Sequence, residues 1–189
     1  MGIGGIFSTP RHVLAALCGI AIASSAATQP ASFGWRTNDQ PSQPDPSRAS
    51  KDGFGAMIVI TDDADAFYKA WANPSPPTIS TTDRVVRGKK IEGIILFSNC
   101  KPLPNGNCRV EFSLDMEGPG GAAYGEPASG ISYEGPPLSD YALNVSRMSL
   151  GFRFDDSDKP GRYVYNVSVT DIGSGIKLRL QAPFVAQEQ

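Results

Sequence analysis

Histidine is almost absent from this chain: its one histidine is His12, near the N-terminus of the 189 residues. Nucleophilic catalysis of the Ser-His-Asp or Cys-His kind needs a histidine beside the nucleophile, and many zinc sites use histidine ligands. If the N-terminal segment is removed from the mature protein, both kinds of site are excluded in their usual form. We therefore expect no catalytic residue, no metal site and no cofactor, and we expect the protein not to be an enzyme.

The chain also lacks an excess of charge of one sign and a long hydrophobic run. It has 17 basic and 19 acidic residues, with no cluster of Lys and Arg of the kind that nucleic acid requires. Its longest apolar run is Val13–Ala23. As a helix this run would span about 16 Å, against roughly 30 Å for the hydrocarbon core of a bilayer. We expect no nucleic-acid partner, and no transmembrane segment after removal of the run.

The apolar run has the flanks of a secretory signal. Arg11 precedes it, and small residues in the sequence SSAATQ follow it. This is the layout of a cleaved signal peptide. We predict a signal peptide over residues 1–27 and a mature protein that is periplasmic or extracellular.

Cysteine is scarce, and two of the three cysteines, Cys100 and Cys108, enclose a turn sequence. Their spacing is neither that of a zinc knuckle nor that of a C-x-x-C redox site. Asn105-Gly106 between them is a strong hairpin signal, because both residues tolerate a positive φ. In an oxidising compartment such cysteines pair. We predict a structural disulfide that closes the tip of a hairpin formed by strands 91–97 and 110–116.

The mature sequence is rich in β patterns. Apolar and polar residues alternate in the stretches 108–116, 148–154, 163–169 and 176–180. A period of two places each apolar set on one face of a strand, which predicts half-buried antiparallel strands. The stretches 56–60 and 91–97 are apolar on both faces, as in central strands. Several short strands separated by turn sequences predict an all-β fold, a single antiparallel β-sandwich.

One short helix interrupts the β pattern between residues 62 and 74. Asp62 is expected to cap it, with Asp63 and Asp65 in its first turn, and Pro74 is expected to end it. The apolar residues at three- and four-residue spacing share one face: Ala64, Phe67 and Trp71. We expect this helix to cover an open end of the sandwich. The alternative for the acidic trio is a calcium site, although capping explains all three residues.

The stretch from Lys159 to Val185 resembles the last two strands of bacterial secreted immunoglobulin-like and macroglobulin-like domains. The shared features are a Pro-Gly corner, an aromatic residue at the start of the penultimate strand, an Asp that ends this strand and a Gly-containing hairpin. The resemblance implies an immunoglobulin-like β-sandwich, a fold that carries many unrelated functions. It lacks the core cysteine pair and the buried tryptophan of antibody domains.

Composition divides the rest of the chain. Residues 28–53 are rich in Pro, Ser and Gln, and we expect them to be disordered. We expect the sandwich to span residues 54–186, with a tail at 187–189. Gly and Pro are frequent within 117–143, which predicts edge strands and loops there.

Two groups of side chains are candidate sites. Exposed tyrosines on Gly-rich loops are favoured binding anchors, and the candidates are Tyr124, Tyr133 and Tyr141. The alternative is that these tyrosines pack back onto the edge of the sandwich. The acidic turn of Asp155, Asp156 and Asp158 either binds calcium or is a plain turn; the sequence leaves both open.

Three functions are compatible with these features. The leading hypothesis is a non-enzymatic, exported interaction module that binds another envelope or extracellular protein through an edge strand or the tyrosine-bearing loops. The second is an accessory structural subunit tethered by residues 28–53. The third is a glycan-binding or glycan-hydrolysing protein that uses surface carboxylates, with Glu126 and Glu134 as the residues to test.

Overall fold

A computed structural model describes residues 35–37, 40–43, 45–73, 79–137 and 142–188. The predicted signal peptide and Tyr141 lie outside the described residues. No helix among the described residues is long and apolar enough to cross a membrane.

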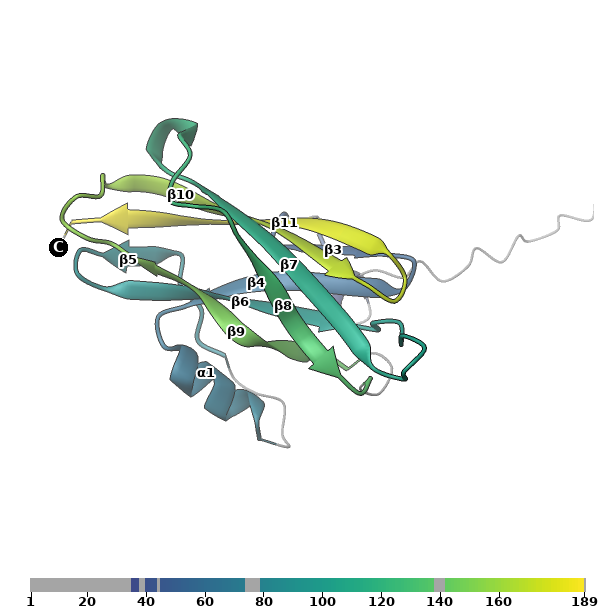
Figure 1. Ribbon diagram of the computed structural model, residues 1–189. Coiled ribbons are helices and arrows are strands. Elements are labelled where there is room, and N and C mark those ends of the chain that lie inside the picture. The colour runs from purple at the N-terminus through teal and green to yellow at the C-terminus, as the bar shows by residue number, and fades with distance from the viewer. Residues whose placement is uncertain (1–34, 38–39, 44, 74–78, 138–141, 189) are drawn as a thin grey trace, which may run out of the picture. The chain divides into compact units, whose positions relative to one another are not determined.

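The described chain is all-β with one α-helix (Figure 1). Its elements are, in order, β1 (Arg36–Thr37), β2 (Gln40–Pro41), β3 (Arg48–Lys51), β4 (Phe54–Thr61), α1 (Ala64–Trp71), β5 (Arg84–Val86), β6 (Lys90–Ser98), β7 (Cys108–Glu117), the 3-10 turn η1 (Pro119–Gly121), β8 (Ala128–Gly135), β9 (Asn144–Arg153), β10 (Gly161–Asp171) and β11 (Ile176–Gln187). Every stretch with a strand pattern in the sequence forms a strand, and β8 in the breaker-rich segment is an edge strand as expected.

The main strands form two sheets. The four-stranded sheet has the order β3-β4-β6-β9, and the five-stranded sheet has the order β5-β11-β10-β7-β8. All neighbouring strands are antiparallel except β5 and β11. These two pair in parallel, with residues 84–86 of β5 opposite residues 185–187 of β11. The expectation of a purely antiparallel fold is therefore wrong at this edge.

One hydrophobic core lies between the two sheets, which we call together the two-sheet body. Its buried side chains come from the inner faces of both sheets, as the period of two requires. The largest of them include Phe54, Ile58, Phe97, Phe152, Tyr163, Tyr165, Leu180 and Phe184. Within this core the Tyr165 hydroxyl donates a hydrogen bond to the Leu150 carbonyl at 2.9 Å, from one sheet to the other. Burial raises the pKa of Tyr165, because it disfavours the phenolate.

Helix α1 covers the outer face of the four-stranded sheet, not an open end of the body. Phe67 is buried with Ile94 and Leu96 of β6, and Trp71 stacks on the Phe67 ring at 5.8 Å. This second cluster explains why β4 and β6 are apolar on both faces. The cap is Asp63, whose side chain accepts the Ala66 N–H at 2.9 Å, so the prediction of Asp62 was wrong by one residue.

The predicted disulfide joins Cys100 and Cys108, with Cα atoms 5.9 Å apart. The predicted hairpin is wrong, because β6 belongs to the four-stranded sheet and β7 to the five-stranded sheet. The disulfide thus closes a loop that crosses between the sheets. The buried Asp171 carboxylate holds this loop against the β10–β11 turn, since it accepts the N–H of Lys101 at 3.1 Å and that of Gly173 at 3.2 Å.

The sheet begins earlier than the expected boundary at residue 54. Strand β3 lies within the segment expected to be disordered, and it pairs with β4 along its whole length. Trp35 is held here as well, because its indole N–H donates to the Ala49 carbonyl at 3.0 Å. At the other end β11 continues to Gln187, one residue beyond the expected limit.

Candidate functional site

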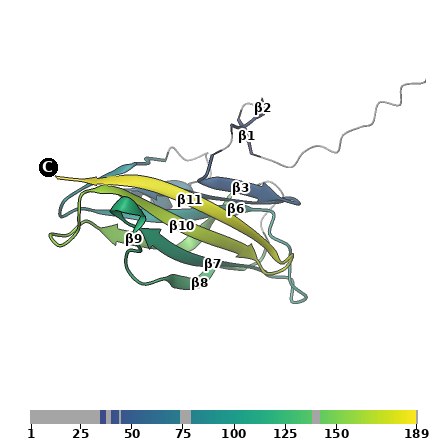
Figure 2. The ribbon, with the colours of Figure 1, turned by 90° about the horizontal axis from the view of Figure 1, so that it is seen from above.

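The two-sheet body has two sides along which the edges of its sheets meet. These sides differ in how far the edge strands are paired. On one side β11 lies next to both β3 and β5, and Figure 2 shows β3 beside β11. The Gln181 N–H donates to the Pro46 carbonyl at 2.7 Å, and the Val185 N–H donates to the Asp83 carbonyl at 2.8 Å. Pro183, which lies midway between them, has no N–H to satisfy. From residue 181 to 185 this edge therefore offers no free donor, and we call it the sealed side.

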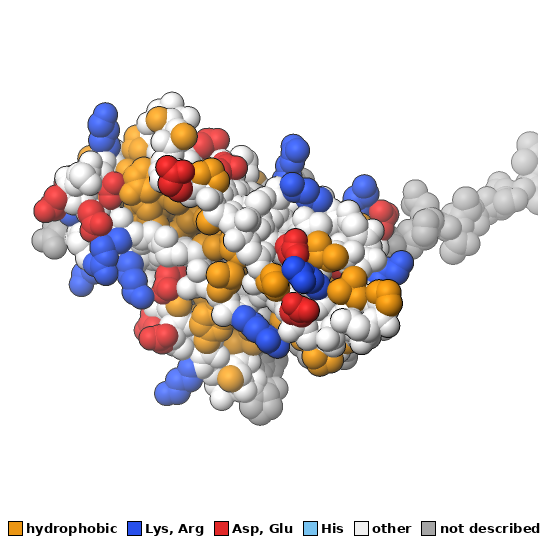
Figure 3. All heavy atoms as spheres, viewed as in Figure 1, with side chains coloured by type: hydrophobic (Ala, Val, Ile, Leu, Met, Phe, Trp, Pro, Cys, Tyr) orange, Lys and Arg blue, Asp and Glu red, His pale blue; other side chains and the backbone are white. Residues whose placement is uncertain are grey.

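On the opposite side, the open side, two edge strands face each other. Among the described strands, β8 pairs with β7 alone and β9 with β6 alone, so each has one edge without a described partner. Between them is a groove of about 430 Å³. Its apolar lining comes from β7, β9 and the loop before β8: Phe112, Leu114, Met116, Tyr124, Met148, Leu150 and Phe152. In Figure 3 hydrophobic side chains gather in a band over the gap between β8 and β9.

Each edge strand is irregular in one half and regular in the other. In β8, Ser132 is an extra residue between the pairs Tyr133–Val110 and Ile131–Glu111. In β9, the register shifts between Ile94 and Leu96 of its neighbour. Such bulges block edge-to-edge pairing where they occur. The groove is lined by residues 128–129 of β8 and 148–153 of β9. Pairing with the neighbouring strand is regular at 128–129 and at 149–153, so a further strand can pair there.

Gly130 of β8 has no side chain to fill the space between Phe112 of its own sheet and Met148 of the other sheet. Gly130 of β8 lies against Phe112, and a Cβ atom there would be 3.3 Å from the Phe112 ring and 3.9 Å from the Met148 sulfur. Met148 itself is 41% exposed. At the rim, Glu126 and Arg153 supply one charge of each sign.

Of the predicted tyrosine anchors, Tyr124 lines the groove. Its ring contacts those of Phe152 and Tyr163, with centroids 5.5 and 5.2 Å away. Its hydroxyl donates to the Asp158 carboxylate at 2.8 Å. Burial, together with Asp158, raises the pKa of Tyr124. Tyr124 is thus a fixed wall of the groove.

Tyr133 lies on β8, outside the residues that line the groove, and it is half-buried as Tyr124 is. Its ring packs on Phe97 at 5.3 Å, under the guanidinium of Arg147, and its hydroxyl donates to the Pro136 carbonyl at 2.8 Å. The structure therefore does not bring Tyr124 and Tyr133 into one anchor cluster. Both pack onto the body, which was the alternative for these residues.

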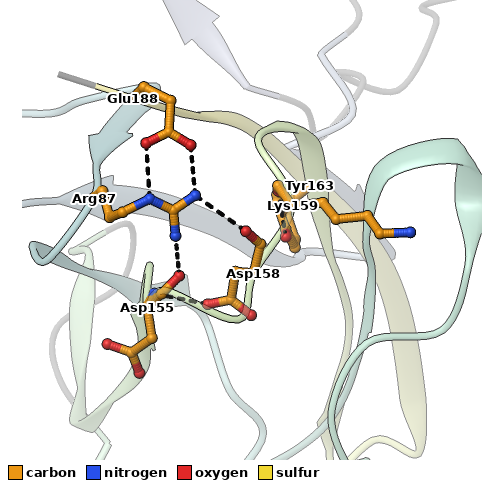
Figure 4. A network of polar contacts seen from close by, with 6 residues as sticks. All are labelled: Arg87, Asp155, Asp158, Lys159, Tyr163 and Glu188. Atoms are coloured by element: carbon orange, nitrogen blue, oxygen red, sulfur yellow. Dashed lines mark hydrogen bonds and ion pairs between the residues drawn. The ribbon is translucent and has the colours of Figure 1, made fainter.

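The acidic turn forms part of a structural joint (Figure 4). Arg87 donates to both carboxylate oxygens of Glu188, at 2.8 and 2.5 Å, and to the carbonyls of Asp155 and Asp158. The hydrogen bond from Arg87 lowers the pKa of Glu188. The guanidinium also lies 4.2 Å from the centre of the Phe154 ring.

The carboxylate of Asp158 is engaged in the same joint. It accepts the N–H of Asp155 at 2.8 Å in addition to the Tyr124 hydroxyl. Within the described part of the chain, no group of three or more Asp, Glu, Cys or His side chains is placed to hold a metal ion. The turn ties the end of β11 to the β9–β10 connection.

The surface carboxylates proposed for glycan chemistry are spread over two regions. Glu134 lies 3.8 Å from Arg109, which is paired more closely with Glu111 at 2.7 Å. Glu126 is at the rim of the apolar groove. The structure does not bring Glu126 and Glu134 into one site.

Sequence reasoning missed the groove itself. Its methionines, Met116 and Met148, come from strands of different sheets. Alternation placed each on an apolar strand face, but only the order of strands in the sheets shows that these two faces meet at an open side. The Gly- and Pro-rich segment 117–143, which contains β8, was the available signal, because it predicted edge strands here.

No protein-family model and no curated protein matches this chain. Among solved structures, a family 123 glycoside hydrolase from Clostridium perfringens, studied for glycolipid glycan hydrolysis, matches 72% of this chain with 13% identity and a TM-score of 0.44. The alkylpurine DNA glycosylase AlkC from Pseudomonas fluorescens, bound to DNA with an abasic site analog, matches 56% with 16% identity and a TM-score of 0.35.

The chain spans only 28% and 27% of the lengths of these two proteins. At such values neither neighbour indicates a fold family or an activity for this chain.

Proposed function

We propose that the protein is an exported, non-enzymatic, immunoglobulin-like interaction module that takes an extended segment of another envelope or extracellular protein into the groove between β8 and β9. The observation that carries this proposal is the apolar groove between two unpaired sheet edges. Edge strands recruit partner strands through main-chain hydrogen bonds, and pockets for alternate side chains select them. An apolar strand lying here would cover the exposed Met148 and the partly buried Leu114 and Met116.

The order of the strands supports an immunoglobulin-like sandwich. In that fold the strands C, F and G form one sheet, and A, B and E lie in the other. If β6, β7, β9, β10 and β11 take the places of B, C, E, F and G, the sheets of this chain follow the same order. β4 and β5 then divide the role of the first strand between the two sheets.

A tyrosine at the start of β10 supports the same assignment. Immunoglobulin folds carry a tyrosine near the start of strand F whose hydroxyl bonds to the backbone a few residues upstream. Here the Tyr163 hydroxyl donates to the Lys159 carbonyl at 2.8 Å. Two residues later, where antibody domains have their second core cysteine, Tyr165 makes the hydrogen bond to the opposite sheet.

The disulfide supports export. Disulfides persist in oxidising compartments such as the periplasm and the cell exterior. The Cys100–Cys108 bond is buried, and it joins the loop after β6 to the first residue of β7. A partner in the envelope or outside the cell would meet the protein in this form.

Site-specific photo-cross-linking tests the proposal. A photoreactive amino acid replaces Met148 on the open side or, as a control, Val185 on the sealed side; both side chains are 41% exposed. In cells that export the full chain, we expect a discrete cross-linked protein from position 148 and none from 185. A Met148→Lys variant should fail to compete for that protein, because a charge would enter an apolar groove. Equal labelling from both positions would contradict the proposal.

A further inference from the structure

A second groove, of about 590 Å³, lies on the outer face of the five-stranded sheet and is unrelated to the apolar one. Strands β7, β10 and β11 build it, and their pairing register places outward side chains of the three strands in rows across the sheet. Asn166 of β10 lies between Asp115 and Gln181, and Ser168 lies between Ser113 and Arg179. Its volume is within the range of sites for small molecules, about 300–1,000 Å³.

A chain of hydrogen bonds fixes one half of this groove. The Gln181 amide donates to the Asn166 carbonyl oxygen at 2.9 Å. The Asn166 amide in turn donates to the carboxylates of Asp115 and Glu117, at 3.0 and 3.1 Å. These contacts orient all four side chains before any ligand arrives. They leave the second oxygen of each carboxylate free to accept a hydrogen bond.

The other wall of the groove carries two cations. Lys177 and Arg179 lie two residues apart on β11 and line the groove. Within the described part of the chain neither forms an ion pair, whereas Arg87, Arg109 and Arg48 do. Strand β10 separates these cations from Asp115 and Glu117 by two strand spacings, roughly 10 Å in the backbone. The serine hydroxyls between the two walls can donate or accept.

We propose that this groove binds a saccharide that carries a carboxylate. The carboxylate would lie against Lys177 and Arg179, and sugar hydroxyls would donate to Asp115, Glu117 and the side-chain carbonyl of Gln181. A polyanion such as nucleic acid is disfavoured, because the two carboxylates would repel its repeated charges. The lining residues include no aromatic ring for stacking a base. Mixed charge around a polar floor selects a ligand with one acidic group and several hydroxyls.

An NMR titration of the folded, disulfide-bonded protein tests this site. The probe is galacturonic acid, which carries one carboxylate, and the controls are its uncharged methyl ester and inorganic phosphate. We expect saturable shifts of the side-chain amide signals of Asn166 and Gln181 with the acid. The ester should bind at least about tenfold more weakly, because it loses a charge-assisted hydrogen bond.

Two variants sharpen the titration. Arg179→Ala should weaken binding of the acid about tenfold, whereas Arg84→Ala, on β5 and outside the groove, should leave it unchanged. Absence of saturable shifts, equal binding of acid and ester, or the same shifts with phosphate alone would overturn the proposal. So would shifts that depend on protein concentration, since the face would then be a contact between copies. The Met148 cross-link should survive in Arg179→Ala, so each proposal can fail without the other.

Discussion

The sealed side and the open side of this protein solve the same problem in different ways. A sheet edge exposes unpaired N–H and C=O groups, which invite pairing with other chains. On the sealed side, the Pro46 carbonyl and the parallel strand β5 pair with the edge of β11. Pro183, between them on β11, has no N–H to expose. On the open side, bulges protect only half of β8 and β9, and the regular halves border an apolar groove.

The difference teaches where a partner strand can add. The edge of β11 is protected from residue 181 to residue 185, whereas the edges of β8 and β9 are protected only where these strands are bulged. Phe112, Leu150 and Phe152 are buried core residues, yet they also line the open groove. We therefore expect substitutions on the sealed side to change stability and those at the groove surface to change binding.

Phe184→Ala on the sealed side should have the largest effect. The Phe184 ring lies in the centre of an aromatic cluster, with centroids 5.0, 5.6 and 5.3 Å from those of Phe152, Tyr163 and Tyr165. Its removal should lower the free energy of unfolding by about 3–5 kcal/mol. Met148→Ala on the open side should change it by less than about 0.5 kcal/mol. Urea denaturation measures both, and similar losses would break the comparison.

Removal of the disulfide should lower the free energy of unfolding by an intermediate amount. The disulfide closes the loop between β6 and β7, which crosses from one sheet to the other. A Cys100→Ser, Cys108→Ser variant loses a constraint on a short loop, worth about 2.5 kcal/mol in the loop-entropy estimate. Because Asp171 still holds the loop, we expect the β-sheet circular dichroism spectrum to remain. Unfolding in urea with and without reductant gives the value for the native chain. No change on reduction would contradict a structural role.

Acidification should have the smallest effect, at the C-terminal end of β11. Arg87 lowers the pKa of Glu188 below its ordinary value of 4.5. The pair therefore stabilises the fold fully above that value, and the contribution is lost as the pH falls through the lower, folded pKa. The pair is exposed and screened by salt, so we expect a small shift in melting temperature. Glu188→Gln should abolish this component, and an unchanged acid profile in that variant would contradict it.

Most of the strands could be predicted from the sequence because alternation is a local property. The runs that became β7, β10 and β11 each bury one face, as their period of two requires. Which sheet a strand joins is not local. Asn105-Gly106 signals a turn correctly, but the same turn serves a hairpin or a crossing between sheets, and here it serves the crossing.

Composition misled at the N-terminal boundary. Residues 48–51 are polar except for Ala49, and nothing in them suggests a strand. They pair because β4 presents an unpaired edge and Trp35 bonds to Ala49. The candidate sites were equally non-local. The apolar groove joins residues of both sheets, and the second groove joins β7, β10 and β11, whose register no sequence pattern reveals.

Hydrogen exchange of the free protein tests the contrast between the two sides most directly. We predict slow exchange for the amides of Gln181 and Val185, which donate to Pro46 and Asp83 across the sealed edge. The outward amides of β8 at 128–131 and of β9 at 149–153 should exchange as fast as unprotected ones. Rapid exchange at Gln181 and Val185, or strong protection of all β8 and β9 amides, would contradict the account.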